Sequence, residues 1–148
     1  MKISTRVEYG LAALIDIAIY SSTQNLVNVA SIAKRQNIPS KYLEQVLTPL
    51  RQARLIIGIK GAKGGYVLGK TASLITMTDI LNVLDSSIIG EYYESGLNCA
   101  YTMKKIINDN LWKHLEKNIN QIASSVTLEM LVDKYKETIS EENIMFYI

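Results

Sequence analysis

Apolar and polar residues alternate with the period of a helix from the beginning of the chain. The first such stretch runs to about Tyr20, and either Ser4 or Thr5 can cap it. Its apolar face consists of residues spaced three and four apart, which are Val7, Leu11, Leu14, Ile15, Ala18 and Ile19. This pattern predicts an amphipathic helix that buries one face.

Two shorter helices are predicted after the first. One lies near residues 29–36, with Asn28 as its cap, and a proline-containing break separates it from the next. The other covers residues 41–53, with Ser40 as its cap. Pro49 stands inside this third pattern, where it removes one backbone hydrogen bond, so we expect a kink or a shortened last turn.

The period of the apolar residues then changes from that of a helix to that of a strand. Residues 55–60 and 66–69 are rich in strand-forming residues and flank the glycine-rich loop 61–65, which predicts a β-hairpin. Thr76 and Asp79 have the spacing of a capping box and open another short helix.

The second half of the chain is predicted to be a loop followed by long helices. Residues 86–99 show no period and are expected to form a loop or linker. A long amphipathic helix follows over about 100–124, with an apolar stripe of Met103, Ile107, Leu111, Leu115, Ile119 and Ile122. Thr127 can cap a further helix to about Lys136, and an acidic stretch expected to be mobile precedes an apolar end.

Three helices followed by a two-stranded hairpin is the element order of a winged helix-turn-helix. We therefore expect a mainly α-helical fold with one small β-hairpin, in which residues 1–85 form a DNA-binding domain. Residues 86–148 are expected to provide a linker, a dimerisation helix and a C-terminal tail. Because the first half has its own core, the apolar stripe of the long helix favours a homodimer.

The distribution of charge points to a polyanionic partner for the first half. The net charge of the 148 residues is only +2, and 48% of them are hydrophobic, as in ordinary globular proteins. Residues 1–70 contain ten Lys and Arg against three acidic residues, whereas residues 71–148 contain six against eleven. A basic half beside an acidic half indicates nucleic-acid binding, although chance clustering on solvated surfaces gives the same counts.

Three further features bear on where the protein works. No apolar run approaches the roughly 20 residues of a membrane span. The first residues lack the small-residue cleavage site of a signal peptide. The single cysteine, Cys99, excludes an internal disulfide framework and favours a reducing compartment. We therefore expect a cytoplasmic protein without a membrane partner.

The third helix and the hairpin loop supply the candidate DNA contacts. A recognition helix presents its N-terminal residues to base edges, and here these residues are Ser40, Lys41, Tyr42, Glu44 and Gln45. In the hairpin loop, two lysines and three glycines can approach phosphates, and they are Lys60, Gly61, Lys63, Gly64 and Gly65. The loop could instead cradle a nucleotide, but it lacks the spacing of a P-loop.

Several motifs in order make the chain resemble a known family over nearly its whole length. They are Ser4-Thr5-Arg6, Tyr9-Gly10-Leu11, Tyr42-Leu43-Glu44-Gln45, Leu50-Arg51-x-Ala53-x-Leu55 and Gly61-x-x-Gly64-Gly65-Tyr66. Together they are similar to the Rrf2 family of small bacterial winged-helix transcription regulators. The resemblance implies double-stranded DNA as a partner, a homodimer through the long helix, and further DNA contacts from Ser4, Thr5, Arg6, Arg51 and Tyr66. Lys60 stands where the family usually has an arginine before the wing glycine. Lysine keeps the positive charge but lacks the planar guanidinium group of arginine.

Within that family, two segments are most similar to repressors of cysteine metabolism. These segments are Thr48-Pro49-Leu50 and Met145-Phe146-Tyr147-Ile148. The resemblance implies repression of cysteine or sulfur metabolism genes, and a complex with cysteine synthase, whose substrate pocket accepts a C-terminal isoleucine. Tyr147 and Ile148 would then bind the enzyme. The alternative from the residues alone is that this apolar end docks on its own fold as a strand.

Cys99 and Glu8 are the candidates for a sensor chemistry. Cluster-binding members of the family resemble one another in having three cysteines where this chain has only Cys99, and one thiolate cannot hold a two-iron cluster in the usual way. We expect no metal and no cofactor, although Glu8 matches a ligand position of some members. Cys99 lies in a polar stretch, where it is either a redox-sensing thiol or a cysteine without function.

The sequence contains no pattern typical of an enzyme. No Ser/His/Asp or Cys/His set stands out, and the single histidine, His114, is expected on the polar side of the long helix. The favoured function is therefore a DNA-binding repressor. Two alternatives remain open, namely a redox or nitric-oxide sensor of the same fold and a winged-helix module that binds proteins rather than DNA.

Overall fold

The computed structural model describes residues 2–22, 24–90 and 99–147 of the chain. The first half contains the helices and strands of a winged helix-turn-helix: α1 (Thr5–Tyr20), α2 (Val29–Gln36), α3 (Ser40–Gln52), β1 (Ile56–Ile59), β2 (Gly65–Leu68) and α4 (Met77–Leu84). The second half contains α5 (Tyr101–Ile107), a π-helical segment (Asn108–Trp112), α6 (Lys113–Ser125) and α7 (Leu128–Phe146). Short 3-10 turns lie at Ala72–Leu74 and Ser86–Ile88.

Side-chain caps fix the beginnings of most helices where the sequence predicted them. The hydroxyl of Ser4 caps α1, the side chain of Asn28 caps α2, and Thr76 with Asp79 forms the predicted capping box of α4. Ser40 is an exception, because it is the first residue of α3 and Pro39 occupies the cap position without a side-chain hydrogen bond. The expected shortening at Pro49 is small, since α3 continues through it to Gln52.

The wing is a two-stranded antiparallel sheet that is also hydrogen-bonded to the segment before α2. Gly58 pairs with Tyr66, and Ile59 pairs with Gly65, in the register of β1 and β2. The segment before α2 joins this sheet through one bridge, in which Val27 and Tyr66 exchange hydrogen bonds of 3.1 and 2.7 Å. A Cβ atom on Gly65 would lie 2.7 Å from the Val27 carbonyl oxygen, so the bridge requires glycine there.

One hydrophobic core holds the helices and the wing together. Its fully buried members come from α1, α2, α3, β1 and α4 and include Leu14, Ile17, Ile32, Leu43, Leu47, Leu50, Ile56 and Ile80. The start of α7 also belongs to this core through Leu128 and Val132. Gly10 allows α1 and α4 to approach closely, because a Cβ atom there would clash with the side chain of Leu84. Such burial is the main stabilising contribution to the fold.

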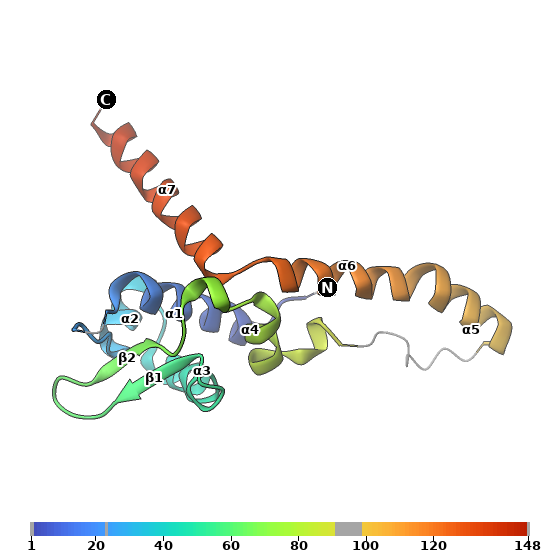
Figure 1. Cartoon of the computed structure of the whole chain (residues 1–148), viewed down its shortest axis with the longest axis horizontal. Coiled ribbons are helices and arrows are strands. Elements are labelled where there is room, and N and C mark those ends of the chain that lie inside the picture. Colours follow the sequence, from blue (N-terminus) through green and yellow to red (C-terminus); the bar gives the residue numbers. More distant parts are fainter. Residues whose placement is uncertain (1, 23, 91–98, 148) are drawn as a thin grey trace.

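The second half forms two helical arms that leave the body of the molecule (Figure 1). α5, the π-helical segment and α6 form one continuous helical stretch, which confirms the long helix predicted over 100–124. α6 packs on α4, and the turn before α7 is tied to the segment before α4 by the hydrogen bond from Leu128 N–H to the Ile75 carbonyl at 2.8 Å. None of the described helices is both long and apolar enough to cross a membrane.

The last helix is longer than the sequence suggested. Thr127 caps α7 as predicted, but the helix continues to Phe146 instead of ending near Lys136. The acidic stretch 137–142, which was expected to be mobile, is helical because it contains neither glycine nor proline. The alternative of a docked C-terminal strand is wrong for the described residues, since Phe146 and Tyr147 are 91% and 93% exposed. Ile148 lies outside the described residues.

Candidate nucleic-acid interface

The first turns of α3 form an exposed polar face over a buried apolar one. Leu43, Val46, Leu47 and Leu50 point into the core. The predicted base-reading residues Ser40, Lys41, Tyr42, Glu44 and Gln45 are all exposed. The turn before α3 is tight, because Asn37 ends α2 in the left-handed conformation at φ 53°. A short turn of this kind presents the second helix of the motif to a groove of DNA.

Tyr42 is held in place on this face by two neighbours. Its ring lies 6.1 Å from the ring of Tyr9 on α1, measured between centroids. The Lys41 ammonium lies 5.2 Å from the centre of the Tyr42 ring, within range of a cation–π contact. The aromatic ring is therefore positioned before any ligand binds, although 41% of the residue is exposed.

A first pocket, on the α1 side of α3, brings several of the predicted residues together. It has a volume of about 410 Å³ and is lined by Thr5, Arg6, Tyr9, Tyr42, Gln45 and Val46. Arg6 also has a structural task, because its Nε donates a hydrogen bond of 3.1 Å to the Leu84 carbonyl. The hydroxyl of Ser4 is likewise engaged as the cap of α1, where it accepts from the Val7 N–H.

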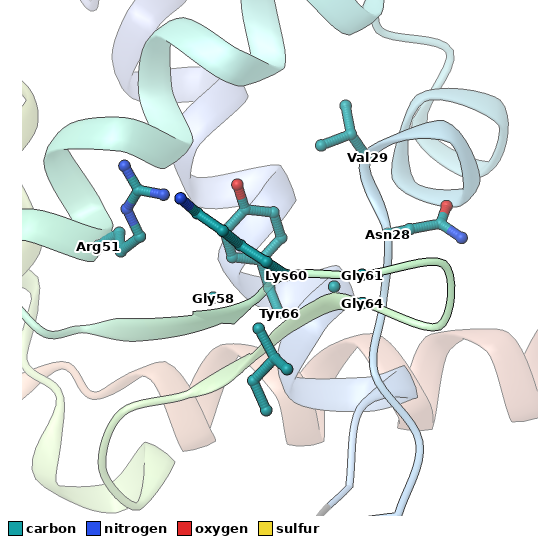
Figure 2. Close-up of a pocket in the computed structure, with 10 residues that line it drawn as sticks. Asn28, Val29, Arg51, Gly58, Lys60, Gly61, Gly64 and Tyr66 are labelled. Carbon is teal, nitrogen blue, oxygen red and sulfur yellow. The ribbon is translucent and has the colours of Figure 1, made fainter.

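A second pocket lies between the wing and α3 and is shown in Figure 2. It has a volume of about 330 Å³, and its predicted members are Arg51, Lys60, Gly61, Gly64, Gly65 and Tyr66. Sequence reasoning did not assign Asn28, Val29, Gly58 and Ile59 to this site, although they also line it. No local motif marks these four residues. They come together only because the folded wing lies against the start of α2. Lys63 is exposed in the wing loop but does not line the pocket.

The two pockets share one electrostatic property. Each contains arginine, and the second adds lysine, while no acidic residue is among the lining residues of either. Gly61 takes a φ of +123° at the turn of the wing, a backbone conformation that favours glycine. The polar face of α3 and the two pockets, one formed with α1 and one with the wing, together form a surface suited to a polyanion.

The other candidate residues lie apart from this surface. The stripe on the long helix is open to solvent in the single chain, with Met103, Leu111, Leu115 and Ile122 exposed by 42–63% and Ile107 and Ile119 partly buried. Cys99 is exposed immediately before α5, and Tyr147 lies beyond the end of α7. Within the described ranges, no group of three His, Cys, Asp or Glu side chains could hold a metal ion.

A winged helix-turn-helix body that carries long appended helices defines the chain as a DNA-binding transcription regulator. The chain belongs to the Rrf2 family, whose model, described as "Iron-dependent Transcriptional regulator", matches residues 3–134. The resemblance drawn from the sequence motifs is thereby confirmed.

Relatives of two kinds are similar to the chain. CymR of Bacillus subtilis is 36% identical over 100% of both chains. Its solved structure, described as that of the global cysteine regulator, matches with a TM-score of 0.74 at 34% identity and covers 90% of this chain and 98% of that one. The structure of IscR from T. potens matches with a TM-score of 0.72 at 31% identity, over 93% and 90%.

A further solved structure that matches the chain is described as an oxidized form. The structure of an oxidized form of CymR from Staphylococcus aureus has a TM-score of 0.70 at 33% identity, and it covers 89% of this chain and 96% of that one. CymR and IscR relatives are named as HTH-type transcriptional regulators, in keeping with the function favoured by the sequence.

The residues present do not fit the iron that the family description implies. Cys99 is the single cysteine of the sequence, so thiolate ligation of a cluster would have to rest on one residue. The carboxylate of Asp109, the first acidic residue of the helical stretch that follows Cys99, is engaged by Lys105 and Lys113 at 3.4 and 2.6 Å. No step of the function is therefore derived through iron.

Proposed function

We propose that the protein is a homodimeric, sequence-specific repressor of cysteine or sulfur metabolism genes. The observation that carries this proposal is the identity of 36% with CymR over the whole length of both chains. IscR relatives match almost as well, but the donor set described above does not suit a cluster. Similarity alone fits both kinds of relative, and the single cysteine of the chain supports the CymR-like function.

In this proposal α3 reads bases and its surroundings hold the DNA backbone. Gln45 and Glu44 on the exposed face offer amide and carboxylate groups, which pair with adenine and cytosine edges in the major groove. Lys60, Lys63 and Arg51 neutralise phosphates and provide salt-dependent affinity. A homodimer through the exposed stripe would place two α3 helices for the two halves of a symmetric site.

The proposal extends to control by cysteine synthase. The apolar end of α7 projects from the body, and its described residues Met145, Phe146 and Tyr147 are 77–93% exposed, so an enzyme can reach them without unfolding the repressor. The Ile148 carboxylate would occupy the place of the substrate carboxylate in the enzyme pocket. O-acetylserine would then compete with the chain end, dissolve the complex and weaken repression.

One experiment tests both parts of this proposal. The full chain and a variant without Ile148 are titrated separately with cysteine synthase and with DNA that carries the bound site. We expect the deletion to abolish enzyme binding and to leave DNA binding by the free dimer unchanged. Enzyme binding that survives the deletion, or that O-acetylserine does not reduce, contradicts the control mechanism but not DNA binding.

A second candidate function is redox sensing through Cys99. It is favoured by the exposure of the only thiol, which leaves that thiol open to oxidants. Peroxide treatment of the wild type and of Cys99→Ser separates the two functions. A loss of DNA binding in the wild type alone would assign the sensor role to Cys99, and equal behaviour of both would exclude it. An absorption spectrum of the purified protein tests the cofactor-bound form of the same alternative.

A protein-interaction module without DNA affinity is the remaining alternative. Retention of the protein on plain DNA at low salt, lost as the salt concentration rises, distinguishes a DNA-binding protein from such a module. We expect retention, because the basic surface includes exposed cations on both α3 and the wing.

A further inference from the structure

The pocket between the wing and α3 concentrates positive charge that the fold itself does not use. Arg51 and Lys60 are exposed, and neither has an ion-pair partner among the described residues. Figure 2 shows the nitrogen atoms of both side chains and the hydroxyl of Tyr66 directed toward the same part of the pocket. All three groups can donate hydrogen bonds to an anion.

Gly58 keeps this pocket open. A Cβ atom at this position would lie 3.1 Å from Cε1 of Tyr66 and 3.3 Å from Cδ of Arg51, which is tighter than ordinary contacts. Gly58 lies in β1 without a positive φ, so its backbone does not demand glycine. A glycine within a strand weakens the strand and often marks a place where a ligand approaches closely. Because Gly58 has no side chain, Arg51 and Tyr66 can occupy their observed positions around the pocket.

The position of the pocket indicates which anion it suits. It lies between the wing and the last turns of α3, beside the helix whose first turns carry the exposed polar residues. When a recognition helix lies in the major groove, the phosphates that border the groove pass along its flanks. A backbone phosphate is therefore the anion that DNA would bring to this place, and no acidic lining residue opposes it.

We propose that this pocket holds a single phosphate diester of the DNA backbone, bound jointly by Arg51 of α3 and Lys60 of the wing. The inference rests on the proposed DNA-binding function and adds a role to it. One phosphate that bridges the helix and the wing fixes how deeply and at what angle α3 enters the groove, because phosphate contacts set register while base contacts set specificity. Gly58 is a positioning residue, since it acts by leaving space for this phosphate.

The test replaces one phosphate at a time by a neutral methylphosphonate in a DNA duplex that carries the bound site. The full-length dimer is titrated with each duplex. For the wild type we expect one position in each half-site where the replacement weakens binding about tenfold, as expected for the loss of charge-assisted hydrogen bonds. Arg51→Ala and Lys60→Ala should each bind more weakly overall and lose most of their sensitivity at that same position.

Two further variants sharpen the result. Gly58→Val keeps every charge but fills the pocket, so it should show the same loss of sensitivity at that position. Lys136→Ala removes an exposed lysine on α7 and should keep the wild-type pattern. Gly58→Val is interpreted only if its circular dichroism spectrum matches that of the wild type. If it does not, Arg51→Ala and Lys60→Ala are sufficient to test the proposal.

The outcomes separate this inference from the proposed function. If Arg51→Ala and Lys60→Ala lose sensitivity at different positions, or at none, the shared phosphate is refuted while DNA binding stands. If the wild type binds no duplex at all, the proposed function fails, and the pocket has no backbone phosphate to hold.

Discussion

Arg35 binds the buried carboxylate of Asp16 with two hydrogen bonds, from Nε at 2.9 Å and from a terminal nitrogen at 2.8 Å. Gln36 donates a third bond of 2.8 Å to the same carboxylate, which has no exposed surface. The Arg35 guanidinium also lies 4.2 Å from the centre of the Tyr20 ring. These contacts join the end of α2 to α1 immediately before the turn that begins α3.

The first prediction concerns this ion pair. Arg35→Ala leaves a buried charge with only Gln36 as a partner, so it should reduce the free energy of unfolding by about 3–5 kcal/mol. Arg35→Lys keeps the charge but loses the planar guanidinium group. Its free energy of unfolding should lie between those of the alanine variant and the wild type. Urea unfolding measures both. A loss below about 1 kcal/mol for Arg35→Ala would show that the pair does not stabilise the fold.

The second prediction concerns pH and the capping box of α4. Burial opposes ionisation of Asp79, but hydrogen bonds from Thr76 and the nearby Lys70 ammonium outweigh it and hold the pKa of Asp79 below its usual 3.8. The ionised form is therefore favoured in the folded state. Its contribution to stability is present above about pH 4 and is lost as the pH falls through the lowered pKa.

Asp79→Asn tests this contribution by thermal unfolding at several pH values. The wild type should melt at a higher temperature than the variant at pH 7, and the difference should shrink below pH 4. Because the Asp79 side chain is 37% exposed, the effect should be small. A difference that is constant from pH 7 to pH 3 would be at odds with the lowered pKa.

The third prediction concerns base reading by α3. Gln45→Ala should cost about 1–3 kcal/mol on the bound site and relax selectivity at one base pair, because a bidentate amide contact is removed. Competition between the bound site and random DNA measures it. Equal losses on both kinds of DNA would mean that Gln45 does not read a base.

The fourth prediction concerns a contact of the wing loop that does not depend on the DNA sequence. Lys63→Ala should weaken binding to all sequences alike and reduce the slope of log affinity against log salt by about one. Lys63 is exposed and does not line the pocket of Arg51 and Lys60, so its phosphate should be a different one. An unchanged slope would remove Lys63 from the DNA contacts.

The fifth prediction concerns the exposed stripe of the long helix. Leu115→Glu places a charge in the middle of the stripe, so in sedimentation experiments the wild type should be the proposed dimer and the variant a monomer. His114→Glu introduces the same charge on an exposed neighbouring residue outside the stripe and serves as the control. Dimers that persist in Leu115→Glu would place the dimer contact elsewhere.

The local rules of the sequence predicted most elements of the fold. Asn28, Thr76 and Thr127 cap helices where the spacing of polar and apolar residues placed them, because an N-cap needs only a side chain and the next backbone amides. The long helix was predicted but its π-helical segment was not, since Asn108–Trp112 carries no local signal for a π turn. α7 extends beyond the predicted end near Lys136, because residues 137–142 include neither glycine nor proline to end the helix.

The sequence provides candidate residues for the interface but not their arrangement in space. Gln45 and Lys60 have chemistry that suggests DNA contact, and the structure places them in different pockets on either side of α3. Gly58 and Asn28 could not be assigned to the second pocket, since they reach it only through the pairing of β1 with β2 and the bridge at Val27. The buried pair of Asp16 and Arg35 was also missed, because α1 and α2 come together only in the folded chain.

The most direct test of sequence-specific repression is to incubate the purified full-length protein with fragments of its own genome and to sequence those it retains at moderate salt. We expect a small set of fragments with inverted repeats, upstream of genes for cysteine or sulfur metabolism, and a repeat that is relaxed at one base pair in the fragments that Gln45→Ala retains. Retention of fragments without any shared sequence, or of none at all, would contradict it.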